Sequence, residues 1–259
     1  PARAQPIDPR LLQATESVVL ANVATGDAQI DAVALAGLRG LSTALFRRSS
    51  VEPADPMTVD VETDDLSLFP FLYWPVTETS PIPSADAYAR INRYLRSGGM
   101  ILFDTRDAEV ARLTGGTTPA ARRLQRIAAG MDIPPLEPVP ADHVLTRTFF
   151  LLGEFPGRYQ GGTVWVEAAP EGAERAEGMP FRNLNDGVTP VVIGANDWAA
   201  AWAVDDAGMP LLPVGRGTTG ERQREMAIRF GINLIMHVLS GNYKSDQVHV
   251  PALLERLGQ

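Results

Sequence analysis

The sequence predicts a single α/β domain built on a doubly wound, mostly parallel sheet, with an antiparallel addition in its second half. Two observations lead to this prediction. Short apolar runs alternate with amphipathic helical stretches through the first half of the chain, as in βαβ units. The stretch Tyr88–Asp107 then joins a helix, the stop Gly98-Gly99 and the apolar run Met100–Phe103. We therefore expect Met100–Phe103 to be an inner strand.

The remaining elements follow from periodicity and from turn residues. Apolar runs bounded by glycine, proline or acidic residues predict strands at Ser17–Val23, Met57–Val61, Phe69–Pro75, Thr146–Leu152, Thr163–Ala168 and Pro190–Gly194. Helical spacing predicts helices up to about Phe46 and over Ser84–Ser97, Ala108–Leu113, Pro119–Ala129 and Glu221–Ser240. Ser84 fits an N-cap, and Gly241 is expected to end the last of these helices.

Two regions of the second half are expected to be less regular. Pro170–Asn185 is polar and rich in glycine, which predicts a mobile loop. The run Ala199–Val204 follows the strand Pro190–Gly194 closely and predicts a hairpin with Asn196-Asp197 at its turn, because this pair favours turns.

Residues 1–14 are predicted to be a linker, and residues 15–259 the α/β domain. The opening PARAQPIDP contains three prolines and resembles a connecting segment. The chain also begins with Pro1 instead of Met. We therefore expect it to be processed or cut from a longer protein.

The composition restricts the partners and the chemistry. The 259-residue chain carries a net charge of −8, which argues against nucleic acid and anionic membrane surfaces as partners. It contains no cysteine, which excludes disulfides, thiolate metal sites and cysteine nucleophiles. The three histidines are far apart and in no metal-ligand spacing, so neither a metal nor a cofactor is predicted. No apolar run reaches the about 18 residues that span a bilayer.

Acidic residues follow three of the predicted strands: Asp27, Asp104 and Asp197. The carboxyl ends of parallel strands meet at one edge of the sheet, where ligands bind in open α/β folds. We therefore predict a pocket for a small molecule at this edge. Its candidate residues are Asp27, Trp74, Asp104, Thr105, Arg106, Asp107, Arg158 and Asp197.

Each candidate also has a plainer interpretation. Asp27 and Asp31 suit the start of a helix, where negative charge is favourable. The stretch Asp104–Asp107 is compatible with a solvated turn that caps the next helix. Trp74 has the size of a core or rim residue, and Arg158 is close enough in sequence to Glu154 to form a surface ion pair.

One glycine-rich stretch, Gly215–Gly220, fits the spacing G-x-G-x-x-G of dinucleotide-binding loops. Pro213 interrupts the strand that this motif requires before it, and no second βα half follows. A flexible loop is the favoured interpretation, and nucleotide binding stays open as an alternative function.

Several stretches resemble a bacterial family, the domain of unknown function numbered 4159. They are ATGD near Asp27, LYWPV at Leu72–Val76, GGMILFDTRD in the centre, NDWAAAWA at Asn196–Ala203, and the closing RFGINLIMHVLSGNYKSDQVHVPALLERLGQ. The resemblance runs from about Ser17 to Gln259. It implies a flavodoxin-like domain similar to class I glutamine amidotransferases. It also implies that the domain is the carboxy-terminal soluble part of a BatA-like bacterial inner-membrane protein, which we place on the cytoplasmic face.

The same resemblance bears on the chemistry. In the amidotransferase-like fold the nucleophile elbow corresponds approximately to Asp104–Arg106 here. A glutaminase needs a cysteine at this elbow, activated by a histidine, and this chain has no cysteine. The resemblance therefore implies the scaffold and argues against glutaminase activity.

Three functions follow from these observations. The favoured function is that of a non-catalytic domain that binds a small-molecule ligand or a partner. The expected partner is the remainder of a larger membrane protein. The second is a hydrolase or transferase in which Asp27, Asp104 and Asp197 act together, with Arg106 or Arg158 holding an anionic group and with a divalent cation as an option. The third is nucleotide binding at Gly215–Gly220.

Overall fold

The computed structural model describes residues 9–168 and 190–257, including the side chains of 13–168 and 190–241. The loop expected at Pro170–Asn185 lies outside the described residues, as do residues 1–8 of the expected linker. Residues 9–14 of that linker belong to helix α1, Pro9–Glu16.

The centre of the molecule is a seven-stranded sheet in the order β2-β1-β3-β4-β7-β6-β5. The five strands from β2 to β7 are parallel and have the order typical of flavodoxin-like folds, and β6 and β5 extend the sheet in antiparallel pairing. This confirms the predicted α/β class and its antiparallel addition. The strands are β1 (Leu20–Val23), β2 (Met57–Val59), β3 (Phe71–Pro75), β4 (Met100–Asp104), β5 (Leu136–Pro138), β6 (Trp165–Glu167) and β7 (Val191–Gly194).

Strand β4 is the inner strand that the sequence predicts. It pairs with β3 on one side and β7 on the other, and every residue from Met100 to Asp104 is buried. Gly98 adopts a left-handed φ of 93° and so ends the preceding helix without the steric penalty of a Cβ. Gly99 is packed against the ring of Tyr94, where a Cβ would lie 2.2 Å from ring carbons.

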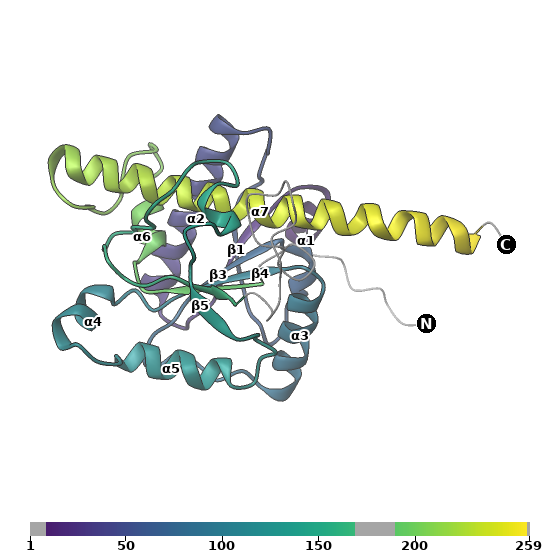
Figure 1. Ribbon diagram of the computed structural model, residues 1–259, viewed down its shortest axis with the longest axis horizontal. Helices are drawn as coiled ribbons and strands as arrows, with labels where there is room; N and C mark the ends of the chain where they lie inside the picture. The colour runs from purple at the N-terminus through teal and green to yellow at the C-terminus, as the bar shows by residue number, and fades with distance from the viewer. Residues whose placement is uncertain (1–8, 169–189, 258–259) are drawn as a thin grey trace.

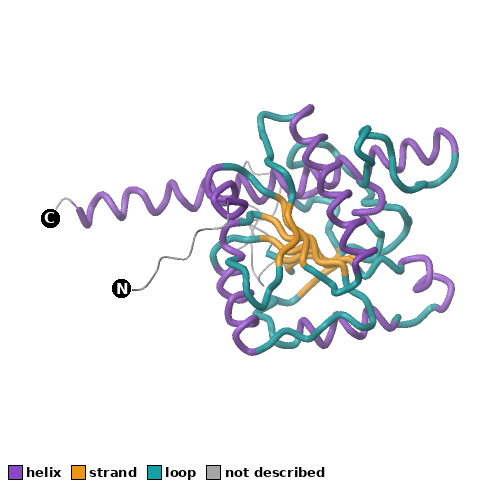
Figure 2. The backbone as a smooth tube through the Cα atoms, turned by 180° about the vertical axis from the view of Figure 1, so that it is seen from behind, coloured by secondary structure: helices purple, strands orange, loops and turns teal. Residues whose placement is uncertain are grey.

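Helices cover both faces of the sheet, as Figures 1 and 2 show. One face packs against α2 (Ala28–Arg48), α6 (Trp198–Trp202) and α7 (Gly217–Leu257), and the other against α1, α3 (Ala85–Arg96) and α5 (Pro119–Ala128). Short helices α4 (Ala108–Thr114), η1 (Leu66–Leu68) and η2 (Val144–Thr146) complete the described structure. The sheet is therefore doubly wound.

Alternation along the strands decides which residues face which layer. In β4, Met100 and Leu102 belong to the core under α2 and α7, whereas Ile101 and Phe103 belong to the core under α3 and α5. Successive side chains of a strand point to opposite faces. Asp104, two residues after Leu102, is therefore directed to the α2–α7 side.

The prediction of a hairpin around Asn196-Asp197 is wrong. Residues Trp198–Trp202 form helix α6, and the carbonyl of Asp197 accepts a hydrogen bond from the N–H of Ala201. The alanine-rich composition of this segment favours a helix, since alanine has the highest helix propensity. A left-handed Asp197 turns the chain from β7 into that helix.

The strand expected at Thr146–Leu152 is also wrong. This segment holds the end of η2 and a series of turns, and it is anchored by Asn233 of α7 instead of by a neighbouring strand. The Asn233 amide donates to the carbonyls of Leu145 and Phe150 at 2.8 and 2.9 Å and accepts from the N–H of Phe150 at 2.8 Å. A buried side chain thus satisfies backbone groups that would otherwise pair in a sheet.

The prediction that Gly241 ends the last helix is wrong, because α7 continues to Leu257. A glycine in a helix interior costs only about 1 kcal/mol relative to alanine, which is insufficient to end a helix. Figure 1 shows the last part of α7 running out beyond the body of the domain. Within the described residues, no helix combines the length and the apolar character needed to cross a membrane.

Gly37 and Gly40 allow α2 to lie directly on the backbone of α6, which leads to a first prediction. A Cβ on Gly37 would lie 2.4 Å from the carbonyl oxygen of Ala199. We expect Gly37→Ala to lower the free energy of unfolding by about 1–3 kcal/mol, because the two backbones must separate. Urea denaturation measures this loss. Gly153→Ala is the control, since a Cβ there meets no atom within 4 Å and should leave stability nearly unchanged.

Candidate functional site

The Asp104 carboxylate lies at the centre of the carboxyl edge and is fully enclosed, with 0% of the residue exposed. Its Oδ1 accepts hydrogen bonds from the N–H groups of Arg106 at 2.9 Å and Asp197 at 3.2 Å. Its Oδ2 accepts from the Tyr73 hydroxyl at 2.9 Å and the N–H of Trp198 at 2.8 Å. One side chain thereby joins β3, the turn after β4 and the start of α6.

Both turns that donate to Oδ1 are conformationally strained. Arg106 and Asp197 have φ values of 58° and 56°, and no other non-glycine residue in the described part of the chain has a positive φ. This conformation costs about 1–2 kcal/mol for a residue with a Cβ. Both residues direct their N–H groups at the same carboxylate oxygen, so their strained geometry is held by Asp104.

The environment strongly affects the ionisation of Asp104. Burial raises its pKa, the nearby Asp197 carboxylate raises it further, and the donors Trp198, Tyr73 and Arg106 oppose the rise, which leaves a pKa of about 7. Burial also raises the pKa of the Tyr73 hydroxyl well above its usual range, so Tyr73 remains a neutral donor. The carboxyl groups of Asp104 and Asp197 therefore titrate as a pair, and protonation of one of them reduces the repulsion between them.

Two arginines balance the second carboxylate. Burial raises the pKa of Asp197, while the Arg106 and Arg158 guanidinium groups act to lower it. The Arg158 Nη1 lies 3.7 Å from Asp197 Oδ2, and the Arg158 side chain is 34% exposed compared with 9% for Asp197. Arg106 keeps a buried Nε without a hydrogen-bond partner among the described residues. Arg158 thus separates this charge cluster from solvent.

The loop that carries Arg158 is fixed to the turn after β7. The N–H groups of Arg158 and Tyr159 donate to the carbonyls of Asp197 and Asn196, and the Gln223 amide of α7 donates to the carbonyls of Gly157 and Arg158. A Cβ on Gly157 would lie 2.1 Å from the Asn196 carbonyl oxygen, so only glycine permits this approach. The loop is a rigid part of the site.

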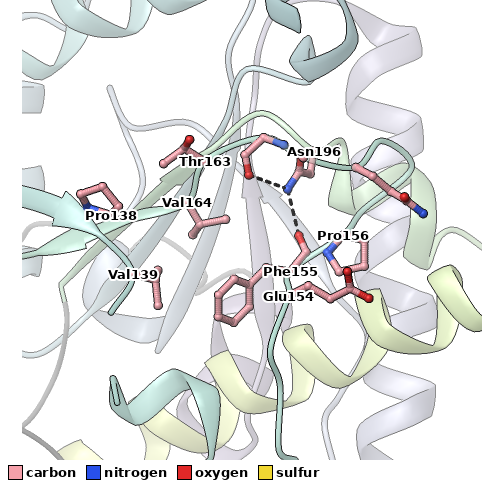
Figure 3. A pocket seen from close by; sticks show the side chains of 11 residues that line it. Pro138, Val139, Glu154, Phe155, Pro156, Thr163, Val164 and Asn196 are labelled. Atoms are coloured by element: carbon pink, nitrogen blue, oxygen red, sulfur yellow. Dashed lines mark hydrogen bonds between the residues drawn. The ribbon is translucent and has the colours of Figure 1, made fainter. Parts of the chain in front are cut away.

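A small pocket of about 260 Å³ lies beside this loop and is shown in Figure 3. Its apolar walls include Val139, Phe155 and Val164. The buried Asn196 amide donates to the carbonyls of Phe155 at 2.9 Å and Gly162 at 3.4 Å and accepts from the Gly162 N–H at 3.1 Å. The Asn196 amide is thus already hydrogen-bonded to the protein backbone, and it fixes the shape of the pocket.

A larger groove of about 810 Å³ opens on the other side of the β4–α4 turn. It runs between α4 and α5 and the strands β5, β6 and β7, and its floor includes Ile193 and Trp165. Thr105 and Asp107 line the end nearest β4. The Thr105 hydroxyl donates to Asp107 Oδ1 at 2.6 Å. The volume is typical of a small-molecule site.

The structure thus distributes the predicted site residues over several places. It brings Asp104, Arg106, Arg158 and Asp197 together in the charge cluster, and it places Thr105 and Asp107 in the neighbouring groove.

The two other predicted residues have separate surroundings. Trp74 is buried under α3 and packs on Phe103 with ring centroids 5.2 Å apart. Asp27 is the N-cap of α2 and accepts from the N–H groups of Gln29 and Ile30 at 2.9 and 3.2 Å. Each therefore occupies the position that the plainer interpretation gave it.

Trp165 and Tyr73 were not predicted as site residues from the sequence. Trp165 is 40% exposed and lines the groove from β6, and the alternation of TVWVEA already places it on the face opposite the buried Val166. Tyr73 donates to Asp104 across two strands, and this pairing depends on the strand order, which the sequence does not specify.

The described residues provide no group of three or more histidine, aspartate and glutamate side chains that could hold a metal ion. The stretch Gly215–Gly220 forms the bend before α7 and the first turn of that helix, and the segment before it is not a strand in the structure. The structural context that a dinucleotide fingerprint requires is therefore different from the one found here.

These features define an open α/β domain of flavodoxin-like strand order, with a charge cluster and a groove at the carboxyl edge of its sheet. Comparison with family models matches residues 19–239 to the "Domain of unknown function (DUF4159)". Because the match covers most of the chain, the protein belongs to this family. A comparison with curated proteins gives no significant match.

The four hydrogen bonds to Asp104 lead to a second prediction. In Asp104→Asn the amide group must face two N–H or O–H donors, which leaves buried donors unsatisfied. We expect a loss of about 2–4 kcal/mol in the free energy of unfolding, measured by urea denaturation at pH 7. Asp132→Asn is the control, because that side chain is 59% exposed in a surface ion pair and should contribute less than about 1 kcal/mol. An equally small loss for Asp104→Asn would contradict the structural role.

The raised pKa of Asp104 leads to a third prediction. Between an unfolded pKa of 3.8 and a folded pKa of about 7, the folded protein retains a proton that the unfolded chain releases. This contribution to stability is complete below pH 3.8 and is lost as the pH rises to about 7, with a size on the order of 4 kcal/mol. We expect the stability advantage of the wild type over Asp104→Asn to shrink from pH 4 to pH 8. An advantage that grows over this range would contradict the pKa direction.

Proposed function

We propose that this domain is a non-catalytic ligand-binding module that uses the carboxyl edge of its sheet. The observation that carries this proposal is the groove of about 810 Å³ at the ends of β4 and β7. Ligands of open α/β sheets bind beyond the carboxyl ends of the strands, and small-molecule sites commonly have volumes of 300–1,000 Å³.

The surroundings of Asp104 support a binding role without catalysis. Its two oxygens already accept four hydrogen bonds, and the residue has no exposed surface. A general acid or base must come within hydrogen-bonding reach of the substrate. The chain also contains no cysteine that could act as a nucleophile.

We also propose that the domain is the soluble part of a larger bacterial membrane protein, on its cytoplasmic face, with an amidotransferase-like variant of the flavodoxin-like fold. Support comes from the resemblance described above. The left-handed turn at Arg106, directly after a central strand, is in keeping with the amidotransferase-like scaffold.

One observation favours the second candidate, a hydrolase or transferase. Asp104 and Asp197 form a coupled pair with raised pKa values, next to Arg106 and Arg158. Strongly shifted pKa values are common in catalytic sites. In this alternative Asp197 would be the acid–base group and Arg158 would hold an anionic substrate.

A fourth prediction separates the two candidates. We expect a fragment collection, screened by thermal shift, to give ligands that raise the Tm, and we expect Ala128→Trp, which fills the groove from α5, to abolish these shifts. The adjacent Ala129→Trp is the control, because Ala129 is exposed and does not line the groove.

Turnover is measured on the same protein with p-nitrophenyl esters, phosphates and glycosides. The binding proposal expects no turnover above that of the Asp197→Asn variant. Turnover by the wild type that disappears in Asp197→Asn would replace the binding role with the catalytic one. A screen in which no ligand responds to Ala128→Trp would remove the groove as the site.

A further inference from the structure

We propose that the groove between α5 and β6 binds a small organic cation with an apolar or aromatic body, held between the indole of Trp165 and the carboxylate of Asp107. This inference rests on the proposed ligand-binding function and specifies the chemistry of its ligand. It is drawn from the composition of the groove walls, the exposure of one aromatic ring and the position of one charge.

The walls of the groove are predominantly apolar. Side chains from α4, α5, β5, β6 and β7 line it without contributing a charge, and those with apolar character are Ala111, Ala121, Leu124, Ala128, Leu136, Trp165 and Ile193. The polar lining consists of threonines, Gln125 and glycine backbone, with one carboxylate at the end near β4. Ligand sites of this kind bind an apolar body and orient it by a few polar groups.

Trp165 provides the flat surface. Its register partners are Ile193 on β7 and Pro138 on β5, so the indole lies on the same face of the sheet as Ile193, which also lines the groove. It is 40% exposed, whereas Trp74, Trp198 and Trp202 are at most 3% exposed. An indole with one open face offers both apolar contact and a site for a cation.

Asp107 provides the charge, because among the described residues that line the groove no other is ionisable. Its Oδ1 accepts the Thr105 hydroxyl at 2.6 Å, which orients the carboxylate. Although Asp107 is at the N-cap position of α4, its side chain makes no capping hydrogen bond. Oδ2 has no partner in the described parts of the chain. A carboxylate of this kind, at the end of an apolar groove, complements an ammonium group.

The opposite charge has weaker support. Arg122 lies outside the lining and donates to the Thr117 carbonyl at 2.6 Å. Arg106 acts on Asp197, on the other side of the β4–α4 turn. An anionic ligand would therefore meet Asp107 without a cationic side chain from the described part of the groove wall, which makes an anion the decisive negative probe.

The test uses three probes that share a phenyl ring and differ in charge: 2-phenylethylamine, 2-phenylethanol and phenylacetate. Binding to the full chain is followed by tryptophan fluorescence and by the indole N–H signals in NMR spectra. We expect the amine to bind about five- to ten-fold more tightly than the alcohol, in accord with about 1 kcal/mol for one partly exposed ion pair, and phenylacetate to bind most weakly. The signal of Trp165, assigned with Trp165→Phe, should shift, while those of the three buried tryptophans stay in place.

Two variants isolate the charge. Asp107→Asn should reduce the affinity for the amine to that for the alcohol and leave the affinity for the alcohol unchanged. Asp132→Asn changes a surface carboxylate that pairs with Arg96 and is not among the lining residues of the groove, so it should change neither affinity. Asparagine is favourable at an N-cap, so the Asp107 variant is expected to fold.

The proposal is overturned if phenylacetate binds most tightly, if the three probes bind equally, or if the Trp165 signal does not respond to the amine. These outcomes differ from a failure of the proposed function. Fragments whose binding is abolished by Ala128→Trp but unaffected by Asp107→Asn would leave ligand binding in place and remove only the cationic class. Absence of every groove ligand would remove both.

Discussion

The acceptance of four hydrogen bonds by the Asp104 carboxylate is the interaction on which the carboxyl edge depends. The donors come from β3, from the turn after β4 and from the start of α6, which are separate parts of the chain. A buried carboxylate is unfavourable unless hydrogen bonds compensate for its lost hydration. Here the four hydrogen bonds oppose the effect of burial without cancelling it, since the pKa of Asp104 stays raised to about 7. They also hold two left-handed residues, Arg106 and Asp197, in conformations that are otherwise unfavourable.

The strained turns have opposite consequences on the two sides of β4. On the α6 side, the Asp197 carboxylate lies near Arg106 and Arg158 and completes the charge cluster. The loop that carries Arg158 covers this cluster and is hydrogen-bonded to the turn after β7. On the α5 side, the same turn after β4 presents Thr105 and Asp107 to the groove. The end of β4 therefore separates the buried charge cluster from the groove. The charge cluster fixes the backbone from which Asp107 projects.

Much of the scaffold could be predicted from the sequence because its signals are local. The run Met100–Phe103, the glycine stop before it and the N-cap Ser84 each express a short-range preference, and the structure contains all three. The errors came where distant groups decide the outcome. Thr146–Leu152 is strand-like in composition, yet Asn233, more than 80 residues away, satisfies its backbone. The helix Trp198–Trp202 follows a left-handed Asp197, whose N–H group is held by Asp104 more than 90 residues away.

The site was predictable in part for the same reason. That acidic residues end parallel strands at one edge is a rule of the fold, and it brought Asp104 and Asp197 into the prediction. The rule does not say which side chains become enclosed. Asp27 caps a helix and Trp74 belongs to a core, whereas Trp165 was overlooked because an exposed aromatic on a short strand carries no motif. Its meaning depends on what lies opposite, which only the packing of α5 against the sheet determines.

The separation of the charge cluster from the groove also determines which substitutions each of them tolerates. A substitution at Asp104 leaves buried donors unsatisfied in three segments at once, so this position is constrained by stability. Residues of the groove wall such as Ala128 and Trp165 contact open space and satisfy no buried polar group, so they are free to differ without loss of the fold. A rigid edge with an adaptable wall is the arrangement expected of a scaffold whose ligand is determined by surface side chains instead of by the fold.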